Sequence, residues 1–305
     1  MLKVGLFGSG STVDLHAEAI KNTPGLQLSG FFNTSNSAKS NGQNFLSANK
    51  EFIELFENSD IIDIVSSDIP LFQFVSFAIK AGKHIFIENP QLSEISEIET
   101  LLNLEQEAHV KVQIGFTERY NPAFQAALPY LLNPMFIESH RMIPYSSTQP
   151  DISMISDIMV HDIDIILSVV KANIKRVHAS GVRVFGNYPD IVNAHLEFDN
   201  GATANLTSNR ISSKGVLYSK FYQPHSRVQV DFLKLSTQVL KQEKDKFAVN
   251  DIMVIPKNKT EVALRGFQKA IVQNSEPLVS LDDSYHALKI AEMIMDKIHV
   301  VKKAV

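Results

Sequence analysis

The sequence predicts an α/β protein of two domains: a doubly wound parallel sheet, then an α+β domain with a large, mostly antiparallel open sheet. Three observations predict this. The 305 residues exceed what one hydrophobic core usually serves. Short apolar runs alternate with helical stretches up to about residue 118. Beyond it, longer strands with alternating polarity take over. We therefore expect domains at 1–118 and 119–305.

In the first half, the strands are continuous runs of Val, Ile and Phe rather than alternating ones. Such runs are typical of parallel strands buried on both faces by helices. The predicted strands are 3–8, 26–33, 61–67, 83–89 and 110–116. The predicted helices between them are 11–21, 37–46, 51–56, 71–80 and 93–107.

The second half has a different rhythm. Asn200-Gly201 is a strong two-residue hairpin signal, because both turn positions favour positive φ. The predicted strands are 135–142, 175–185, 190–198, 202–209, 215–223 and 226–232. Helices are predicted at 121–132 and 155–170, and the segment 260–300 returns to helical spacing.

Composition and charge exclude several classes of function. The net charge of -4 and the pI near 6.2 argue against nucleic-acid binding, which calls for a basic surface. The absence of cysteine excludes disulfides and thiolate metal sites. The chain starts directly with "LKVGLFG", and no apolar run approaches the roughly 20 residues that cross a bilayer. We expect a cytoplasmic protein without a membrane span.

A phosphate-binding turn is predicted after the first strand, in "VGLFGSGSTVDLHAEAI". Gly8 and Gly10 suit the tight turn and the close approach of a pyrophosphate, and the following helix offers unpaired N–H groups. The hydroxyls of the turn can add donors; they belong to Ser9, Ser11 and Thr12. Val13 replaces the third glycine of a GxGxxG fingerprint, which weakens the motif without removing its phosphate surface.

The second strand ends at Asn33, where an acidic residue usually takes the ribose hydroxyls of NAD. Asn can still bind a ribose diol, and it lacks the charge that repels a 2′-phosphate. No arginine follows in "NTSNSAK" to attract one. We expect Asn33 and Thr34 to contact an NAD(P) cofactor, with NAD slightly favoured.

Four segments carry motifs: "GSGSTVDLHA" with His16, "AGKHIFIENP", "GFTERYNPAF" and "DIMVHDID". In this order and at similar spacing they resemble the Gfo/Idh/MocA oxidoreductases. The resemblance implies a Rossmann domain joined to a second domain with an open sheet, and NAD(P)-dependent chemistry on a carbinol, mostly of sugars. Within the family, "IESHR" and "MVHDID" are most similar to UDP-N-acetylglucosamine 3-dehydrogenases. Association with a second copy through the C-terminal sheet is also implied.

The family's motifs transfer residue by residue. Glu88 and Pro90 match the ends of its Glu-Lys-Pro corner, and Asn89 stands where the lysine would be. Ser66-Ser67 replaces its Thr-Pro, and Leu71 falls where a His is common. In the second domain the matching residues are Arg119, Pro122, Asp157, His161 and Asp164, with Met159 at a glycine position. The resemblance implies cofactor contacts for Ser66, Ser67, Glu88 and Asn89.

His161 is the best remaining general base, since an imidazole exchanges protons near neutrality. Asp157, four residues earlier, can orient it, and Asp164, three residues later, can share the same helix face and contact substrate. The alternative is a surface pair or a loop cap. A metal at this spacing is a minor interpretation, and no metal site is predicted.

Asn89 can donate a hydrogen bond to the nicotinamide amide or to substrate, or it only closes a turn before Pro90. For a diphosphate we expect Arg119, Arg141 and Arg210, because Arg suits bidentate phosphate contacts. Each is alternatively a solvated charge or a salt-bridge partner. Two functions follow: a sugar or nucleotide-sugar dehydrogenase, or a non-catalytic family member that binds a dinucleotide or sugar without turnover.

Overall fold

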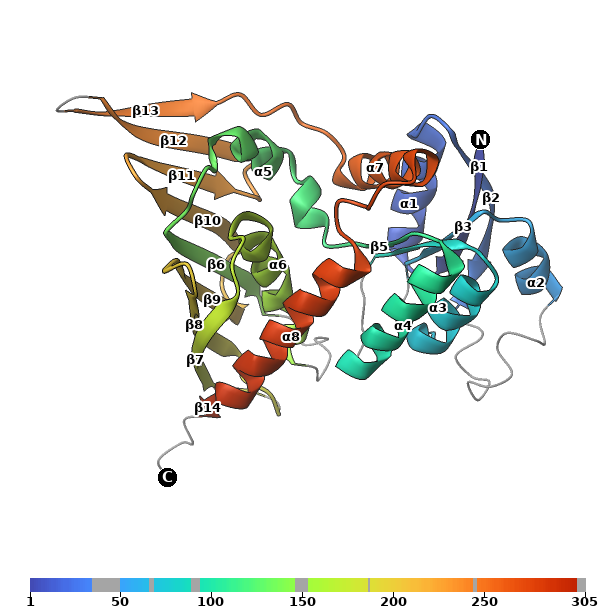
Figure 1. The fold of residues 1–305 in the computed structure, drawn as a ribbon, viewed down its shortest axis with the longest axis horizontal. Helices are drawn as coiled ribbons and strands as arrows, with labels where there is room; N and C mark the ends of the chain where they lie inside the picture. The colour runs from blue at the N-terminus through green and yellow to red at the C-terminus, as the bar shows by residue number, and fades with distance from the viewer. Residues whose placement is uncertain are drawn as a thin grey trace. The chain divides into compact units, whose positions relative to one another are not determined.

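The computed structural model describes residues 1–34, 50–65, 69–88, 94–145, 153–185, 187–243 and 246–300 (Figure 1). The chain divides into two compact units, Met1–Tyr120 with Lys257–Tyr285, and Asn121–Pro256 with His286–Val305. The sequence-based division at residue 118 assigned Lys257–Tyr285 to the second domain, whereas this segment packs with the first unit.

The first unit contains a five-stranded sheet in the order β2-β1-β3-β4-β5, with every pair parallel. This confirms the doubly wound arrangement. The strands are β1 (Leu2–Gly8), β2 (Leu26–Asn33), β3 (Ile61–Ile64), β4 (His84–Ile87) and β5 (Val112–Ile114). The order reverses between β1 and β3, and ligands of such sheets bind outside the carboxyl ends of the strands at this switch point.

Helices cover the sheet of the first unit (Figure 1). Aromatic side chains pack between sheet and helices on each of its two faces. On one face, Phe7 packs edge-on against Phe52 and Phe74, both at 5.3 Å between ring centroids. On the other, Phe86 packs against Phe267 at 6.1 Å. The helices of the unit are α1 (Ser11–Asn22), α2 (Lys50–Glu57), α3 (Leu71–Lys80), α4 (Ile95–Ala108) and α7 (Lys259–Gln273). The helix predicted at 37–46 lies outside the described residues.

The second unit contains a nine-stranded sheet in the order β13-β12-β11-β10-β6-β9-β8-β7-β14. Its pairs are antiparallel except β6 with β9 and β7 with β14, which confirms the predicted fold class. The strands are β6 (Phe136–Pro144), β7 (Ile174–Val182), β8 (Ile191–Phe198), β9 (Thr203–Ser212), β10 (Val216–Gln223), β11 (Ser226–Asp231), β12 (Ser236–Glu243), β13 (Lys246–Ile252) and β14 (His299–Val300).

The Asn200-Gly201 turn joins β8 to β9 in an antiparallel hairpin, as predicted, but the loop is longer than two residues and Asn200 does not have the positive φ expected of it. Gly201 has a φ of 86°, a left-handed conformation that a residue with a Cβ adopts at a cost. β12 and β13 were not predicted, because their polar segments "STQVLKQE" and "KFAVNDI" carry weak strand signals.

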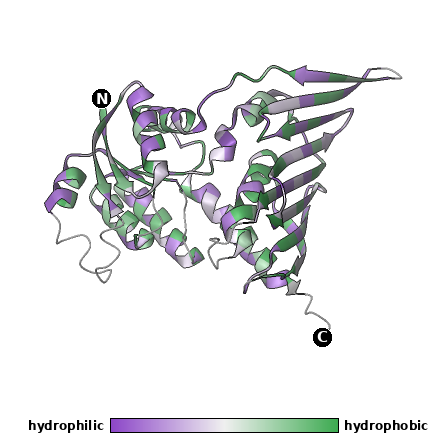
Figure 2. Ribbon diagram, turned by 180° about the vertical axis from the view of Figure 1, so that it is seen from behind, coloured by the Kyte–Doolittle hydropathy of each residue, from purple (hydrophilic) through white to green (hydrophobic). Residues whose placement is uncertain are grey.

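Helices lie against one face of the nine-stranded sheet (Figure 1). They are α5 (Pro122–Ala127), α6 (Val160–Val169) and the part of α8 (Leu281–Lys297) from His286 onward. Buried and half-exposed residues alternate along β9, and Figure 2 shows the same change between hydrophobic and hydrophilic residues along the strands. In the described parts of the chain, every helix is too short or too polar to cross a membrane.

Candidate functional site

The turn between β1 and α1 has the geometry of a phosphate-binding loop. Gly10 has a φ of 78°, and a Cβ placed on it would meet nothing within 4 Å. A Cβ on Gly8 would collide with the Val65 side chain, so only glycine fits there. Gly10 is the N-cap residue and has no side chain to accept from the first turn of α1. The N–H groups of this turn and the helix dipole therefore suit an anion.

Val13 shows why the incomplete glycine motif is compatible with the turn. It is buried and belongs to a cluster with Leu6 and Val65. The third glycine of the fingerprint normally permits close packing of helix on strand. Here an apolar side chain fills that space and leaves the N-terminus of α1 in place. Ser11 is exposed and Thr12 half-buried at this N-terminus.

The end of β2 lies beside this turn. Asn33 pairs in register with Gly8, so both stand at the carboxyl edge of the sheet, and Asn33 is exposed. Thr34 is completely buried, and among the described residues its hydroxyl has no hydrogen-bond partner. The residues present fit the adenosine ribose and pyrophosphate of a dinucleotide. Ser66, Ser67 and Asn89, also predicted to contact the cofactor, lie outside the described residues.

Glu88 follows β4 at the same edge of the sheet, and it belongs to a buried charge array. His16 of α1 contacts Asp63 of β3 through Nδ1, at 2.9 Å, and Glu88 through Nε2, at 3.3 Å. The side chains of His16 and Asp63 are 1% and 0% exposed, whereas that of Glu88 is 23% exposed. Asp63 was not predicted as a site residue, and His16 was named only as part of a motif.

His16 is held as a cation. Burial alone would lower its pKa, but the charges and hydrogen bonds of Asp63 and Glu88 outweigh burial and raise the pKa of His16 to about 10. The signal in the sequence was Asp63 itself, a charged residue in the otherwise apolar strand "IIDI". A carboxylate buried inside a strand requires a partner.

In the second unit, the predicted catalytic residues lie at an irregular helix. The chain forms a π-helical turn at Ile155–Met159 and then enters α6, instead of one regular helix over 155–170. Single π-turns are frequent at functional sites. Asp157, in the turn, and His161, in α6, are half-buried. Asp164 is completely buried, unlike the other two, so the three do not form one accessible face.

The predicted arginines have carboxylate partners in the fold. Arg141 of β6 donates to Asp162 from Nε at 2.9 Å and from Nη2 at 3.1 Å. Arg210 of β9 donates from Nε to Asp190 at 2.8 Å. Each of these four side chains is at least nine-tenths buried. The salt-bridge interpretation therefore applies to both arginines, and contact with a diphosphate stays a prediction.

Arg119 lies in a 3-10 turn, Thr117–Tyr120, in the first unit. Its Nη1 donates to the Leu278 carbonyl at 2.9 Å, and its Nη2 lies 3.1 Å from Asp283 Oδ1. The side chain thereby ties the turn to the segment before and at the start of α8. Substrate binding by Arg119 likewise stays a prediction.

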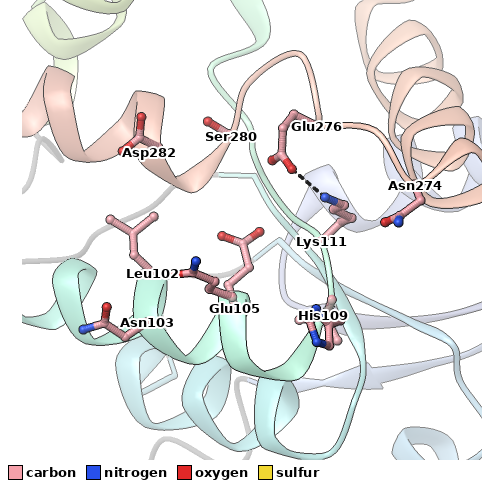
Figure 3. A pocket seen from close by; sticks show the side chains of 11 residues that line it. Leu102, Asn103, Glu105, His109, Lys111, Asn274, Glu276, Ser280 and Asp282 are labelled. Carbon is pink, nitrogen blue, oxygen red and sulfur yellow. Dashed lines mark hydrogen bonds and ion pairs between the residues drawn. The ribbon is translucent and has the colours of Figure 1, made fainter.

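A cavity of about 720 Å³ opens elsewhere in the first unit, between residues 102–111, at the end of α4 and just after it, and the facing segment 274–282 (Figure 3). Lys111 and Glu276 form an ion pair of 2.6 Å in its wall. Glu105 accepts from the Val112 N–H, and burial raises its pKa to about 7. Because Val112 begins β5, this cavity lies at the sheet edge opposite Gly8. Among the described residues, no group of acidic or His side chains is suited to hold a metal ion.

Comparisons with known proteins give the same family for both parts of the chain. The model of the oxidoreductase family with an NAD-binding Rossmann fold, Gfo/Idh/MocA, matches residues 2–116. The model of the Gfo/Idh/MocA C-terminal domain matches residues 141–230. Together the matches cover about two thirds of the chain.

One curated relative is the UDP-N-acetylglucosamine 3-dehydrogenase of Acidithiobacillus ferrooxidans, which is 28% identical over 239 residues, 76% of this chain and 74% of the relative. A solved structure of that organism's enzyme superposes with a TM-score of 0.87 at 23% identity, over 97% of both chains. A levoglucosan dehydrogenase solved with NADH and L-sorbose has a TM-score of 0.82 at 17% identity, over 97% of this chain and 96% of that one. At these identities the solved structures support the fold.

Proposed function

Because this chain belongs to the Gfo/Idh/MocA oxidoreductase family, we propose that it transfers a hydride between NAD(P) and a carbinol of a sugar or nucleotide sugar. The observation that carries the proposal is the turn at Gly8 and Gly10, with the uncapped N-terminus of α1 behind it. No side chain caps the first turn of this helix, and such an N-terminus suits an anion. UDP-N-acetylglucosamine is the first substrate to test, because a curated relative bears that activity in its name.

When bound, the nicotinamide supplies the acceptor or donor of the hydride. His161 takes the hydroxyl proton as the carbinol is oxidised, and returns it in the reverse direction. Asp157, one turn earlier, orients the imidazole. Asp164 is completely buried, and its part is to support α6 from the core side rather than to contact substrate.

The test measures NADH formation from NAD+ with UDP-N-acetylglucosamine and a panel of other UDP-sugars and free sugars. Loss of a general base typically lowers kcat by about 10²–10⁴-fold, and we expect this for His161→Ala. The matched control is His178→Ala, since His178 is 62% exposed on β7 and should leave kcat unchanged. A folded wild-type protein that turns over no sugar in the panel would argue against the proposal.

A second function is favoured by Asn89, which stands where related sequences carry the lysine of the Glu-Lys-Pro corner. A side-chain amide donates hydrogen bonds, but it cannot take up or release a proton near neutral pH. If the lysine is the only competent base, the protein binds its cofactor or a sugar without turnover. Calorimetry that detects NAD+ binding, no wild-type turnover and no gain from Asn89→Lys would establish this alternative.

The proposed cofactor is NAD in preference to NADP. Asn33 stands exposed beside Gly8 and can hydrogen-bond a ribose diol. No arginine follows Asn33 in "NTSNSAK" to attract a 2′-phosphate. Titration with NAD+ and NADP+ should give a lower Kd for NAD+, and Asn33→Asp should widen the difference by repelling the 2′-phosphate. A lower Kd for NADP+ would contradict the proposed preference.

We also propose that the nine-stranded sheet associates with a second copy. On the face away from the helices, half-exposed rings lie in pairs. His140 stacks on Tyr218 at 4.9 Å between ring centroids, and Phe136 lies tilted against Tyr222 at 5.6 Å. Aromatic rings are enriched in protein interfaces. Analytical ultracentrifugation should find a species larger than the 34.0 kDa chain, and Tyr218→Glu should shift it toward a monomer. A wild-type monomer at micromolar concentration would contradict this.

A further inference from the structure

His16, Asp63 and Glu88 form the charge array of the first unit. Asp63 is at its buried end, and Glu88 is at its solvent-exposed end. Asp63 and His16 are almost completely excluded from solvent, and Glu88 is 23% exposed. With one imidazolium and two carboxylates, the array carries a net charge of one negative unit. At the buried end, the charges of His16 and Asp63 neutralise each other. The uncompensated negative charge is therefore that of Glu88, at the solvent-exposed end.

The backbone of Glu88 is fixed from both sides. Its N–H donates to the Ile64 carbonyl of β3 at 2.9 Å. On the other side, Gly115 packs so closely that a Cβ on it would collide with the Glu88 backbone. The side chain is held in turn by His16. Glu88 is therefore a rigidly placed carboxylate, in contrast to an exposed glutamate on a helix.

The strand order indicates which part of a dinucleotide meets Glu88. Gly8 and Asn33, at the ends of β1 and β2, suit the pyrophosphate and the adenosine ribose. The dinucleotide crosses the switch point between β1 and β3, so its nicotinamide half falls on the side of β3 and β4. Glu88 is the residue that follows β4 on this side.

We propose that Glu88 is a specificity-determining residue that favours oxidised over reduced nicotinamide, and that His16 is the positioning residue that holds it. The nicotinamide ring of NAD+ carries a positive charge, and that of NADH carries none. A fixed negative charge beside the ring therefore stabilises the oxidised form alone. The consequence is tighter binding of NAD+, with the affinity for NADH little changed. The inference rests on the cofactor binding of the proposed function.

The test is a pair of equilibrium titrations, with NAD+ followed by calorimetry and NADH by its fluorescence, and it needs no turnover. In Glu88→Gln, which is isosteric and neutral, we expect the Kd for NAD+ to rise about 3–10-fold, as for one partly screened unit charge. The Kd for NADH should change less than about two-fold on the same electrostatic argument. Glu107→Gln, on the exposed surface of α4, is the matched control and should change neither Kd.

His16→Gln tests the positioning role. Without the imidazole, Glu88 loses the ion pair that holds its side chain, so the preference for NAD+ should fall toward that of Glu88→Gln. A preference at or above the wild-type value would overturn the role of His16. If His16→Gln does not fold, the Glu88→Gln titrations carry the test.

Equal changes in both Kd values for Glu88→Gln, or none, would overturn the inference and leave the proposed dehydrogenase activity intact. Failure of the wild-type protein to bind either cofactor would overturn both. Conversely, an altered ratio in a protein without turnover would support the inference and count against the dehydrogenase.

Discussion

Replacing Asp63 with Asn removes the carboxylate that keeps His16 protonated. Raising the pKa of His16 from 6.5 to about 10 corresponds to about 5 kcal/mol of unfolding free energy, at about 1.4 kcal/mol per pKa unit. Because the folded-state pKa lies above the unfolded one, this contribution is complete below about pH 6.5 and is lost as the pH rises to about 10. Between pH 7 and 9, wild-type stability should therefore fall by about 3 kcal/mol from this group.

In Asp63→Asn, His16 becomes neutral and this pH dependence disappears. We expect the variant to be less stable than wild type by about 3–5 kcal/mol at pH 7, the usual cost of breaking a buried pair, and by clearly less at pH 9. The assay is urea unfolding followed by circular dichroism at both pH values. Asp60→Asn is the control, because exposed Asp60 accepts from the Lys3 N–H and Asn can do the same. An equal cost at pH 7 and 9 would refute a charged His16.

Three further changes test other parts of the structure. Gly8→Ala should cost about 1–3 kcal/mol by overpacking against Val65 and should raise the Kd for NAD+; unchanged affinity, measured by calorimetry, would contradict the phosphate-binding role. Asp162→Ala should cost about 3–5 kcal/mol in urea unfolding, because it leaves Arg141 buried and uncompensated, and a cost below about 1 kcal/mol would show that the pair is solvated. Glu105→Gln should raise the melting temperature at pH 8 but not at pH 5, since the raised pKa of Glu105 means that its charged form destabilises the fold; equal shifts at both pH values would contradict this.

Local signals in the sequence predicted the features that depend on neighbouring residues. The continuous apolar strands predicted the parallel sheet, because burial on both faces leaves no polar alternation. Asn200-Gly201 predicted the position of a hairpin, although of its two residues only Gly201 adopts the expected positive φ. Gly8 and Gly10 predicted a turn whose backbone requires glycine.

Features that join distant elements were not predicted. His16 and Asp63 are 47 residues apart and meet only because α1 lies across β3. Arg141 and Asp162 likewise come from β6 and α6, and an arginine in a sequence does not reveal whether its partner is a ligand or a neighbouring carboxylate. The segment Lys257–Tyr285 packs with the first unit, although it follows the second unit's strands in the sequence. Helical spacing predicts a helix, but it does not predict which unit the helix packs against.

The π-helical turn before α6 was also not predicted from the sequence. Apolar residues at helical spacing predicted one helix over 155–170, and the π-turn at Ile155–Met159 changes the phase by a single residue. Hydrophobic spacing cannot resolve such a change. Asp157 and Asp164 therefore differ in burial more than regular helical geometry predicted.

The most direct measurement of the central proposal is isotope transfer from UDP-N-acetylglucosamine deuterated on its sugar ring. The protein is incubated with NAD+ and this substrate, and the mass of the NADH formed is determined. Hydride transfer from the carbinol predicts NADH that carries one deuterium, in wild type and not in His161→Ala. Bound NAD+ that stays oxidised with this and every other deuterated sugar would contradict the proposal.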